Sequence, residues 1–464
     1  MGKMFCKELK PMRITEMVVS TADKKLEPQI LPRVTADINT ELKVLNVYRD
    51  AKKQTWLGFG SALTEAAAYC YAQLPEDKKK EVLRLFYSKE GLGYELGRMH
   101  IGSCDFATQE YAYTEPGDRE MKTFDLGQDR KYVLPMVKDI VAAAPELFLF
   151  ASPWSPPPWM KSNGSTRAGG ELLDEWKTPW AEYVARYLES YAAEGVQIPA
   201  MTVQNEPWAA QTWESCRYTA EGEAELIRDH LGPVLDAHGI PMKFIIWDHN
   251  KERVYERARD TLRDPAVRER VWGIGFHWYS GDHFEAVKMT AEQYPGLKLL
   301  FSEGCPLHQP GRAGFFGMPT SKTPETVEQE DAVAYAHDII GNLNAGMENW
   351  IDWNFCVDKD GGPRHVPYGF AAGMIVNEDG SFRTNLIFDY IGHFSRYIQP
   401  GAKRMGFSRC DQHVEVTAAV NPDGSIVVVA LNQENEDRAY AFRINGQVIR
   451  THMPARTIST FVIE

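Results

Sequence analysis

Positive charge is scarce in this sequence. The 464 residues include 51 Lys and Arg against 64 Asp and Glu, which gives a formal net charge of −13 at pH 7. The basic residues form no stripe. Nucleic acid is therefore excluded as the expected partner, because phosphate backbones are bound by clustered Lys and Arg. We expect the acidity to serve solubility.

Cysteine is also scarce. Seven cysteines are scattered along the chain, their number is odd, and no C-x-x-C pair occurs. This pattern argues against a disulfide framework or a zinc cluster and is typical of a reducing compartment.

Long apolar runs are missing as well. No run approaches the ~18 residues that a membrane span needs, and residues 1–17 contain no apolar segment of the signal-peptide type. We therefore expect no transmembrane segment and a cytoplasmic location, which is compatible with a bacterial origin. We expect no cofactor either: EGLGYELG (90–97) has the glycines of a dinucleotide loop but precedes an apolar stretch instead of following one.

Short apolar stretches alternate with helix-like segments between residues 56 and 355. This alternation predicts a parallel sheet covered on both faces. Eight units in ~300 residues fit a closed (β/α)8 TIM barrel at 51–387 better than an open doubly wound sheet, which is the structural alternative. The eight stretches are WLGFGSA (56–62), YELGRMHIG (94–102), LFLFASPW (147–154), AMTVQNE (200–206), KFIIWDH (243–249), GIGFHWY (273–279), KLLFSEG (298–304) and NWIDWNF (349–355).

Alternating strands and turns replace this pattern in the tail, from about residue 388 to 464. The sequence NPDG (421–424), between two alternating runs, is a strong hairpin signal. The first 50 residues carry similar strands, such as ELKVLNVYRD (41–50). We therefore expect an all-β sandwich built from residues 388–464 together with the N-terminal strands of residues 1–50.

Polar residues follow the apolar stretches in phase, at the strand ends where barrel enzymes build their sites. Two of these residues are the carboxylates Glu206 and Glu303. Paired carboxylates at a barrel mouth suggest glycoside hydrolysis, with one as proton donor and the other as nucleophile. The other candidates at stretch ends are Glu65, Arg98, Asp105, Trp154, Asn205, Asp248, His249, His277, Trp278, Tyr279, Asp352, Trp353 and Asn354.

Tryptophans crowd the same stretch ends, at positions 154, 208, 213, 278 and 353. Indole rings stack on the apolar faces of pyranose rings, so this group favours a sugar site over simple core packing. Asn205 is placed to bond the sugar 2-hydroxyl, or alternatively the local backbone. We expect Trp208 and Trp213 to form an apolar wall that raises the pKa of the acid Glu206 toward ~6.

These residues closely resemble glycoside hydrolase family 30, and within it the acid-β-glucosidase (glucosylceramidase) branch. The resemblance implies a TIM barrel with a β-sandwich, and a retaining double displacement on a β-linked glycoside or oligosaccharide. Glu206 matches the acid/base of the family and Glu303 its nucleophile. The matching segments run in order along the chain: FGSALTEAAA (59–68), RMHIGSCDF (98–106), ASPWSPPPWMKSNG (151–164), TVQNEP (202–207), GIGFHWY (273–279), LLFSEGC (299–305), IDWNFCVDKDGGP (351–363) and NPDGSIVVVALN (421–432).

The resemblance also implies which residues contact the substrate. Residues that match glycone-binding positions are Trp154, Asn205, Trp353 and Asn354, with His277 and Tyr279 in the motif whose Tyr lies near the nucleophile. Glu65 stands where that branch has an Asp that binds sugar hydroxyls, and His365 and Tyr368 replace a Trp and an Asn beside the pocket entrance.

A supporting role is expected for Arg98, Asp105 and Trp278. Arg98 either keeps Glu303 ionised through its charge or forms a structural ion pair with Asp105.

Other functions remain as alternatives. A metal hydrolase would use Asp248, His249, His277, Asp282 and His283, although no established metal-ligand spacing occurs. Cys305 is a conceivable nucleophile, with a buried inert thiol as the simpler interpretation. A non-catalytic carbohydrate-binding protein would keep the tryptophans without needing both carboxylates. Within the family, an endo-β-1,6-glucanase, a β-xylosidase or a β-fucosidase is the alternative to an exo-acting β-glucosidase.

Overall fold

The computed structural model describes residues 12–23, 25–38, 44–308, 310, 321–409 and 412–464. The chain divides into two units that interleave along the sequence. One consists of Met1–Leu57, Glu328–Asn344 and Leu386–Glu464, and the other of Gly58–Val327 and Ala345–Asn385. Cys6, Cys410 and residues 1–11, which include most of the segment searched for a leader, lie outside the described residues.

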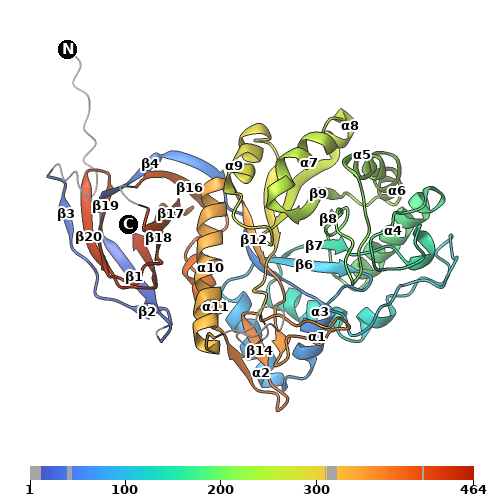
Figure 1. Cartoon of the computed structure of the whole chain (residues 1–464), viewed down its shortest axis with the longest axis horizontal. Coiled ribbons are helices and arrows are strands. Elements are labelled where there is room, and N and C mark those ends of the chain that lie inside the picture. The colour runs from blue at the N-terminus through green and yellow to red at the C-terminus, as the bar shows by residue number, and fades with distance from the viewer. Residues whose placement is uncertain (1–11, 24, 39–43, 309, 311–320, 410–411) are drawn as a thin grey trace. The chain divides into compact units, whose positions relative to one another are not determined.

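A closed barrel of parallel strands forms the core of the second unit (Figure 1). The last strand pairs with the first, at Asn349 with Gly58, which closes the ring and rules out the open sheet. The predicted (β/α)8 fold is confirmed, and the strands coincide with the eight predicted stretches: β5 (Gly58–Ala62), β6 (Leu96–Ile101), β7 (Phe148–Pro153), β8 (Ala200–Thr202), β9 (Lys243–Asn250), β10 (Val271–His277), β11 (Lys298–Glu303) and β12 (Asn349–Asp352).

Amphipathic helices alternate with these strands. In α4 (Lys177–Ala193), the buried Trp180, Val184 and Leu188 are spaced by four residues, which places them on one face of the helix. The remaining helices of this region are α1 (Glu65–Ala72), α2 (Glu76–Tyr87), α3 (Val133–Ala143), α5 (Ala220–Glu225), α6 (Gly232–Ala237), α7 (Val254–Thr261), α8 (Pro265–Arg270) and α9 (Phe284–Gln293). Most of α10 (Pro324–Ala345) belongs to the first unit. A small sheet of β13 (Val357–Asp358), β14 (Met374–Val376) and β15 (Phe382–Thr384) follows β12.

The first unit contains a mainly antiparallel sheet in which strands from the two ends of the chain are neighbours. Strand β1 (Ile14–Ser20) pairs with β21 (Thr457–Ile463), so N-terminal strands join the tail as predicted. The other strands of this sheet are β2 (Glu27–Pro28), β3 (Val34–Ala36), β4 (Val44–Thr55), β16 (Lys403–Ser408), β17 (Val414–Val420), β18 (Ile426–Asn432), β19 (Arg438–Ile444) and β20 (Gln447–Met453).

The hairpin predicted at residues 421–424 joins β17 to β18. Alternate residues of these strands, such as Val416 and Val428, enter the apolar core of the unit. One expectation for the tail is wrong: it begins with a helix, α11 (Leu386–Ser395), and strands resume at Lys403. All ten residues of this helix are buried, and a short apolar run does not by itself distinguish a buried helix from a buried strand.

The described part of the chain contains no helix both long and apolar enough to cross a membrane. Its five cysteines are Cys70, Cys104, Cys216, Cys305 and Cys356, and all are buried and free, so the described residues hold no disulfide.

Candidate active site

A cavity of about 780 Å³, counting the space open to solvent, lies at the C-terminal ends of the barrel strands. Parallel strands of a closed barrel end at the same rim, so side chains that follow different strands meet there. Both predicted carboxylates, Glu206 and Glu303, line this cavity. The full lining is Asp105, Trp154, Asn205, Glu206, Gln211, Trp213, His249, Asn250, Tyr279, Glu303, Leu307, Trp353 and Phe370.

Glu303 ends strand β11 with each carboxylate oxygen bonded to a different donor. The hydroxyl of Tyr279 donates to Oε1 at 3.0 Å, and Nη1 of Arg98 donates to Oε2 at 2.5 Å. The two contacts hold the carboxylate of Glu303 in one orientation at the cavity. The expected contacts of Arg98 and Tyr279 with Glu303 are thus present in the structure.

Arg98 is buried beneath the cavity and forms hydrogen bonds with several site residues. Its Nη2 donates to Asn205 at 2.8 Å and to Asp248 at 2.9 Å, and its Nε donates to Ser152 at 3.1 Å. Its carboxylate partners among the described residues are Asp248 and Glu303, so the alternative pairing with Asp105 is not observed. Burial alone would raise the pKa of Asp248, but Arg98 and then His277 outweigh it and hold that pKa well below its usual range.

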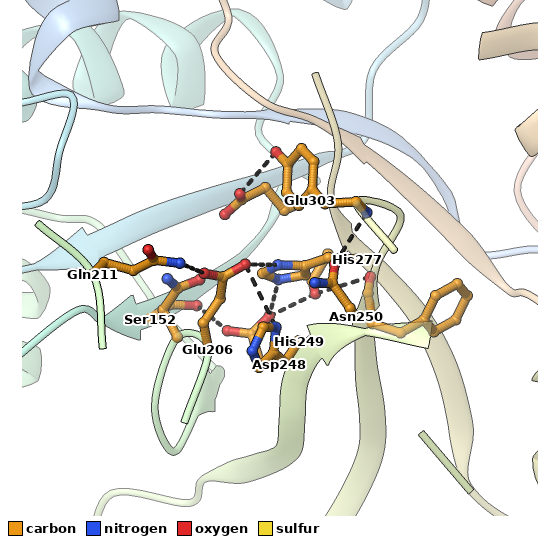
Figure 2. A network of polar contacts seen from close by, with 12 residues as sticks. Ser152, Glu206, Gln211, Asp248, His249, Asn250, His277 and Glu303 are labelled. Carbon is orange, nitrogen blue, oxygen red and sulfur yellow. Dashed lines mark hydrogen bonds and ion pairs between the residues drawn. The ribbon is translucent and has the colours of Figure 1, made fainter. Parts of the chain in front are cut away.

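Glu206 follows β8 and is bordered by two histidines (Figure 2). Its Oε1 lies 3.2 Å from Nδ1 of His277 and 3.6 Å from Nδ1 of His249, while Gln211 donates to Oε2 at 3.4 Å. Burial raises the pKa of Glu206, but the two histidines outweigh burial and lower it to about 2. The expected raised pKa of Glu206 is therefore wrong, because imidazoles from neighbouring strands face its carboxylate.

Trp208 does not form the expected wall. Half of its surface (50%) is exposed, and the guanidinium of Arg253 lies 5.4 Å from its ring centre. Trp213, in contrast, lines the cavity as expected.

His277 lies beneath the cavity instead of lining it, so its predicted contact with substrate is not supported. The side chain is 0% exposed and bridges Glu206 to Oδ1 of Asp248, the latter at 3.1 Å from Nε2. Burial opposes its protonation, but the charge of Glu303 and the bonds to Asp248 and Glu206 raise the pKa of His277 to about 9. His277 therefore holds the carboxylate of Glu206 in position from the side away from the cavity.

The aromatic wall consists of Trp154 and Trp353, whose rings stack with centres 5.4 Å apart. Phe106 packs edge-on against Trp353 at 5.6 Å. The guanidinium of Arg98 lies 4.7 Å from the ring centre of Trp154 and so packs directly against the aromatic wall.

Besides Arg98 and His277, the predicted site residues Glu65, Asn354 and Trp278 do not line the cavity. Glu65 starts helix α1 and is turned away, where it accepts bonds from the backbone and hydroxyl of Thr108 and from Gln128. Asn354 accepts a 2.6 Å bond from Thr64. Trp278 packs edge-on against Trp350 at 6.1 Å.

Asp105, expected only to support the site, lines the cavity itself. Its Oδ1 is buried and has no hydrogen-bond partner among the described residues. Burial, followed by the charge of Glu303, raises the pKa of Asp105 well above its ordinary value.

Four lining residues had no place in the predicted site: Gln211, Asn250, Leu307 and Phe370. Asn250 directly follows the strand-end residues Asp248 and His249, so continuing the strand by one residue would have found it.

At the two substituted entrance positions, His365 pairs with Glu214 at 3.0 Å, and the hydroxyl of Tyr368 lies 3.1 Å from Thr212.

The backbone is strained at four positions of this region. Glu206 (φ 47°), Trp247 (φ 72°), Asp248 (φ 54°) and Asn354 (φ 70°) all adopt left-handed conformations. Such strain costs ~1–3 kcal/mol per residue and clusters at functional sites. Here it turns the chain sharply at the strand ends, where the polar side chains are concentrated.

Neither chemical alternative raised by the sequence is favoured by the geometry. Burial raises the pKa of Cys305 well above its ordinary value, which makes this thiol a poor nucleophile. Of the described residues proposed for a metal hydrolase, His249 and His277 lie close together beside Glu206, but Asp282 and His283 do not belong to that group.

Comparison with known proteins defines the class of this protein. Residues 56–398 match the glycosyl hydrolase family 30 TIM-barrel domain, and residues 401–461 match the family 30 beta sandwich domain. The chain therefore belongs to glycoside hydrolase family 30 and is a glycosidase.

Individual relatives carry different names. The chain is 30% identical to lysosomal acid glucosylceramidase of Mus musculus over 415 residues, which cover 85% of this chain and 78% of that protein. It is 24% identical over 440 residues to endo-1,6-beta-D-glucanase neg1 of Aspergillus fumigatus, covering 89% and 85% of the two proteins. The crystal structure of SrfJ from Salmonella typhimurium is similar with a TM-score of 0.90 and 32% identity, over 96% of this chain and 98% of that one.

Proposed function

We propose that this protein is an exo-acting β-glucosidase that hydrolyses β-glucosides with retention of configuration. The observation that carries the proposal is the pair Glu206 and Glu303, which face one aromatic-walled cavity from strands β8 and β11. Family membership supports the reaction class, and the similarity to a glucosylceramidase supports glucose as the glycone.

In the first step, the carboxylate of Glu303 attacks the anomeric carbon and forms a glycosyl ester. The bond from that carbon to the aglycone oxygen breaks, and the departing oxygen takes a proton through Glu206, which shares that proton at rest with Nδ1 of His277, 3.2 Å away. Tyr279 and Arg98 hold Glu303 in place by the two hydrogen bonds described above, so the nucleophile is oriented before the substrate arrives.

In the second step, the carboxylate of Glu206 removes a proton from water as the water oxygen attacks the anomeric carbon. The ester bond to Glu303 breaks, and both glutamates return to their starting states. His277 and Gln211 keep Glu206 in position through both steps.

The glycone is held by residues around Glu303. Asp105 lines the cavity, and its carboxyl group binds a sugar hydroxyl in this proposal. Asn205, oriented by Arg98, is placed for the 2-hydroxyl, a contact that strengthens in the transition state. The stacked pair of Trp154 and Trp353 offers an apolar face to the sugar ring.

The aglycone is a separate question. Glucosylceramide is one candidate, which would place the enzyme in sphingolipid metabolism, and short oligosaccharides or other β-glucosides are the others. Cleavage of β-1,6-glucan is the second candidate function, since the endo-1,6-β-glucanase of Aspergillus fumigatus is a relative over most of both chains. The buried free cysteines are compatible with work in a reducing compartment such as the cytoplasm.

The test is hydrolysis of a substrate panel, with the Glu303→Gln variant as the blank. The panel contains aryl β-glucoside, β-xyloside, β-fucoside, β-galactoside and α-glucoside, together with gentiobiose, glucosylceramide and β-1,6-glucan. Turnover of the β-glucoside that the variant lacks is the expected result. Preference for β-xyloside or β-fucoside would refute glucose as the glycone, and activity on β-1,6-glucan alone would establish the endo-acting alternative.

A further inference from the structure

The carboxylate of Glu206 and two histidines bring three potential metal-ligand atoms close together. Oε1 of Glu206 lies 3.2 Å from Nδ1 of His277 and 3.6 Å from Nδ1 of His249. The ligand atoms of all three residues are within 4.8 Å of one another. A tetrahedral Zn²⁺ with bonds of ~2.0–2.2 Å holds its ligands ~3.4 Å apart, close to two of these separations.

His249 gives independent evidence for a ligand at this place. Its Nδ1 is buried and has no hydrogen-bond partner among the described residues. The ring packs on Trp247, with ring centres 5.0 Å apart, and its Nδ1 lies 3.6 Å from Oε1 of Glu206. A buried polar atom without a partner is unfavourable, and a bound cation would supply that partner.

His277 is held in the way that metal-binding histidines commonly are. Its Nε2 lies 3.1 Å from Oδ1 of Asp248, while its Nδ1 faces Glu206. A carboxylate behind the imidazole fixes the orientation of a ligating histidine and raises its basicity. Asp248 is in turn fixed by Arg98 and by Ser302, which donates at 2.6 Å.

The position is also accessible from outside. Glu206 and His249 line the cavity, so a cation among the three residues has an open coordination position on the cavity side. The three side chains extend from the ends of β8, β9 and β10, which are neighbours in the barrel, as Figure 2 shows for the labelled residues.

We propose that Glu206, His249 and His277 bind one divalent transition-metal ion, Zn²⁺ or Cu²⁺, and that this ion inhibits hydrolysis. Two imidazoles and one carboxylate suit these ions, whereas Mg²⁺ and Ca²⁺ prefer oxygen ligands alone. Inhibition follows because a carboxylate oxygen that coordinates the ion cannot deliver a proton to the aglycone. The inhibition rests on the proposed function of Glu206, but the binding does not.

The experiment is calorimetric titration of the full chain with Zn²⁺ at pH 7, for the wild type, His249→Asn and the control His283→Asn. His283 is exposed and lies outside the cluster, with Nε2 3.1 Å from the carbonyl of Ser280. We expect one site, with an affinity at least tenfold weaker in His249→Asn and unchanged in His283→Asn. Equal affinity in wild type and His249→Asn, or no binding by the wild type, would overturn the proposal.

A second measurement keeps the inference testable if His249→Asn folds poorly. Co²⁺ is added to the wild type, where visible absorption bands of a tetrahedral complex are expected and are removed by excess Zn²⁺. Absence of such bands would contradict the site.

Inhibition by Zn²⁺ is then measured with the aryl β-glucoside as substrate. The rate of each variant is compared with its own rate without metal, and EDTA is added to reverse the inhibition. Equal sensitivity of wild type and His249→Asn to Zn²⁺ would show that the ion blocks hydrolysis elsewhere. If no substrate of the panel is hydrolysed while the binding results hold, the proposed function fails and the metal site stands.

Discussion

Nη1 of Arg98, on strand β6, donates a 2.5 Å hydrogen bond to Oε2 of Glu303, at the end of β11. The other terminal nitrogen binds Asp248, so one guanidinium orients two carboxylates at once. This fork geometry is available to Arg and not to Lys.

We therefore expect Arg98→Lys to lower kcat/KM at least tenfold although the positive charge is retained. One lost hydrogen bond to a charged group is worth ~1.5–3 kcal/mol. The measurement is aryl β-glucoside hydrolysis, with circular dichroism to confirm folding. Full activity of a folded Arg98→Lys enzyme would show that charge alone suffices.

The hydroxyl of Tyr279 is the second group that orients Glu303, at 3.0 Å from Oε1. Tyr279→Phe removes this single hydroxyl and keeps the ring, so kcat should fall by about tenfold or more while KM changes little. Tyr368→Phe is the matched control, because it also removes one tyrosine hydroxyl, which lies 3.1 Å from Thr212. Comparable losses in both variants would assign the effect to the entrance and not to the nucleophile.

Glu206→Ala should cost most with poor leaving groups, because these need the proton that Glu206 supplies. Azide should restore turnover by attacking the glycosyl ester from the vacated side, giving a β-glycosyl azide. Product configuration is read by NMR. An α-glycosyl azide would mean that the two carboxylates have exchanged roles.

A pH-dependent stability is expected from His393 in α11. The hydroxyl of Thr460 donates to the backbone carbonyl of His393 at 2.9 Å. The same hydroxyl oxygen therefore accepts a hydrogen bond from Nδ1 of the His393 ring, also at 2.9 Å. Nε2 then accepts from Ser20 at 2.8 Å, which is the neutral form of the ring. Burial, with the charge of Arg396, lowers the pKa of His393 from 6.5 to about 3.

The sign of the effect follows from this shift. Between the two pKa values the unfolded chain binds the proton and the folded chain does not, so stability falls as the pH drops below 6.5. The loss approaches ~1.4 kcal/mol per pH unit and is absent above pH 6.5. Denaturation midpoints at pH 7 and pH 5 should therefore differ less in His393→Gln than in the wild type. The same difference in both proteins would refute the assignment.

The barrel was predictable because its parallel strands are buried on both faces and appear in the sequence as short apolar runs. The C-terminal rim follows from the same pattern, and this is how Glu206, Glu303 and Trp154 were found. The orientation of a residue just beyond a strand is not contained in that pattern. Glu65 begins a helix capped by Thr64, which turns its carboxylate away from the cavity.

Contacts between residues of different strands also could not be predicted from the sequence. The expected neighbours of Glu206 were Trp208 and Trp213, which are near in sequence, but its polar neighbours in space are His249 and His277 from the next two strands. The sign of the pKa shift depends on these contacts. Leu307 and Phe370 reach the cavity from segments without periodicity, so no sequence pattern indicates them.

The pairing of β1 with β21 also has a consequence for synthesis on the ribosome. Val18 pairs with Thr460, so β1 must wait for ~440 further residues, or about 20–90 s at ordinary elongation rates. During that time β1 lacks one of the two strands that flank it in the finished sheet, while every barrel strand has already been made. A nascent chain stalled before residue 457 would contain all eight barrel strands and, in its other unit, a sheet with an open edge at β1, the form in which newly made chains most readily associate with one another.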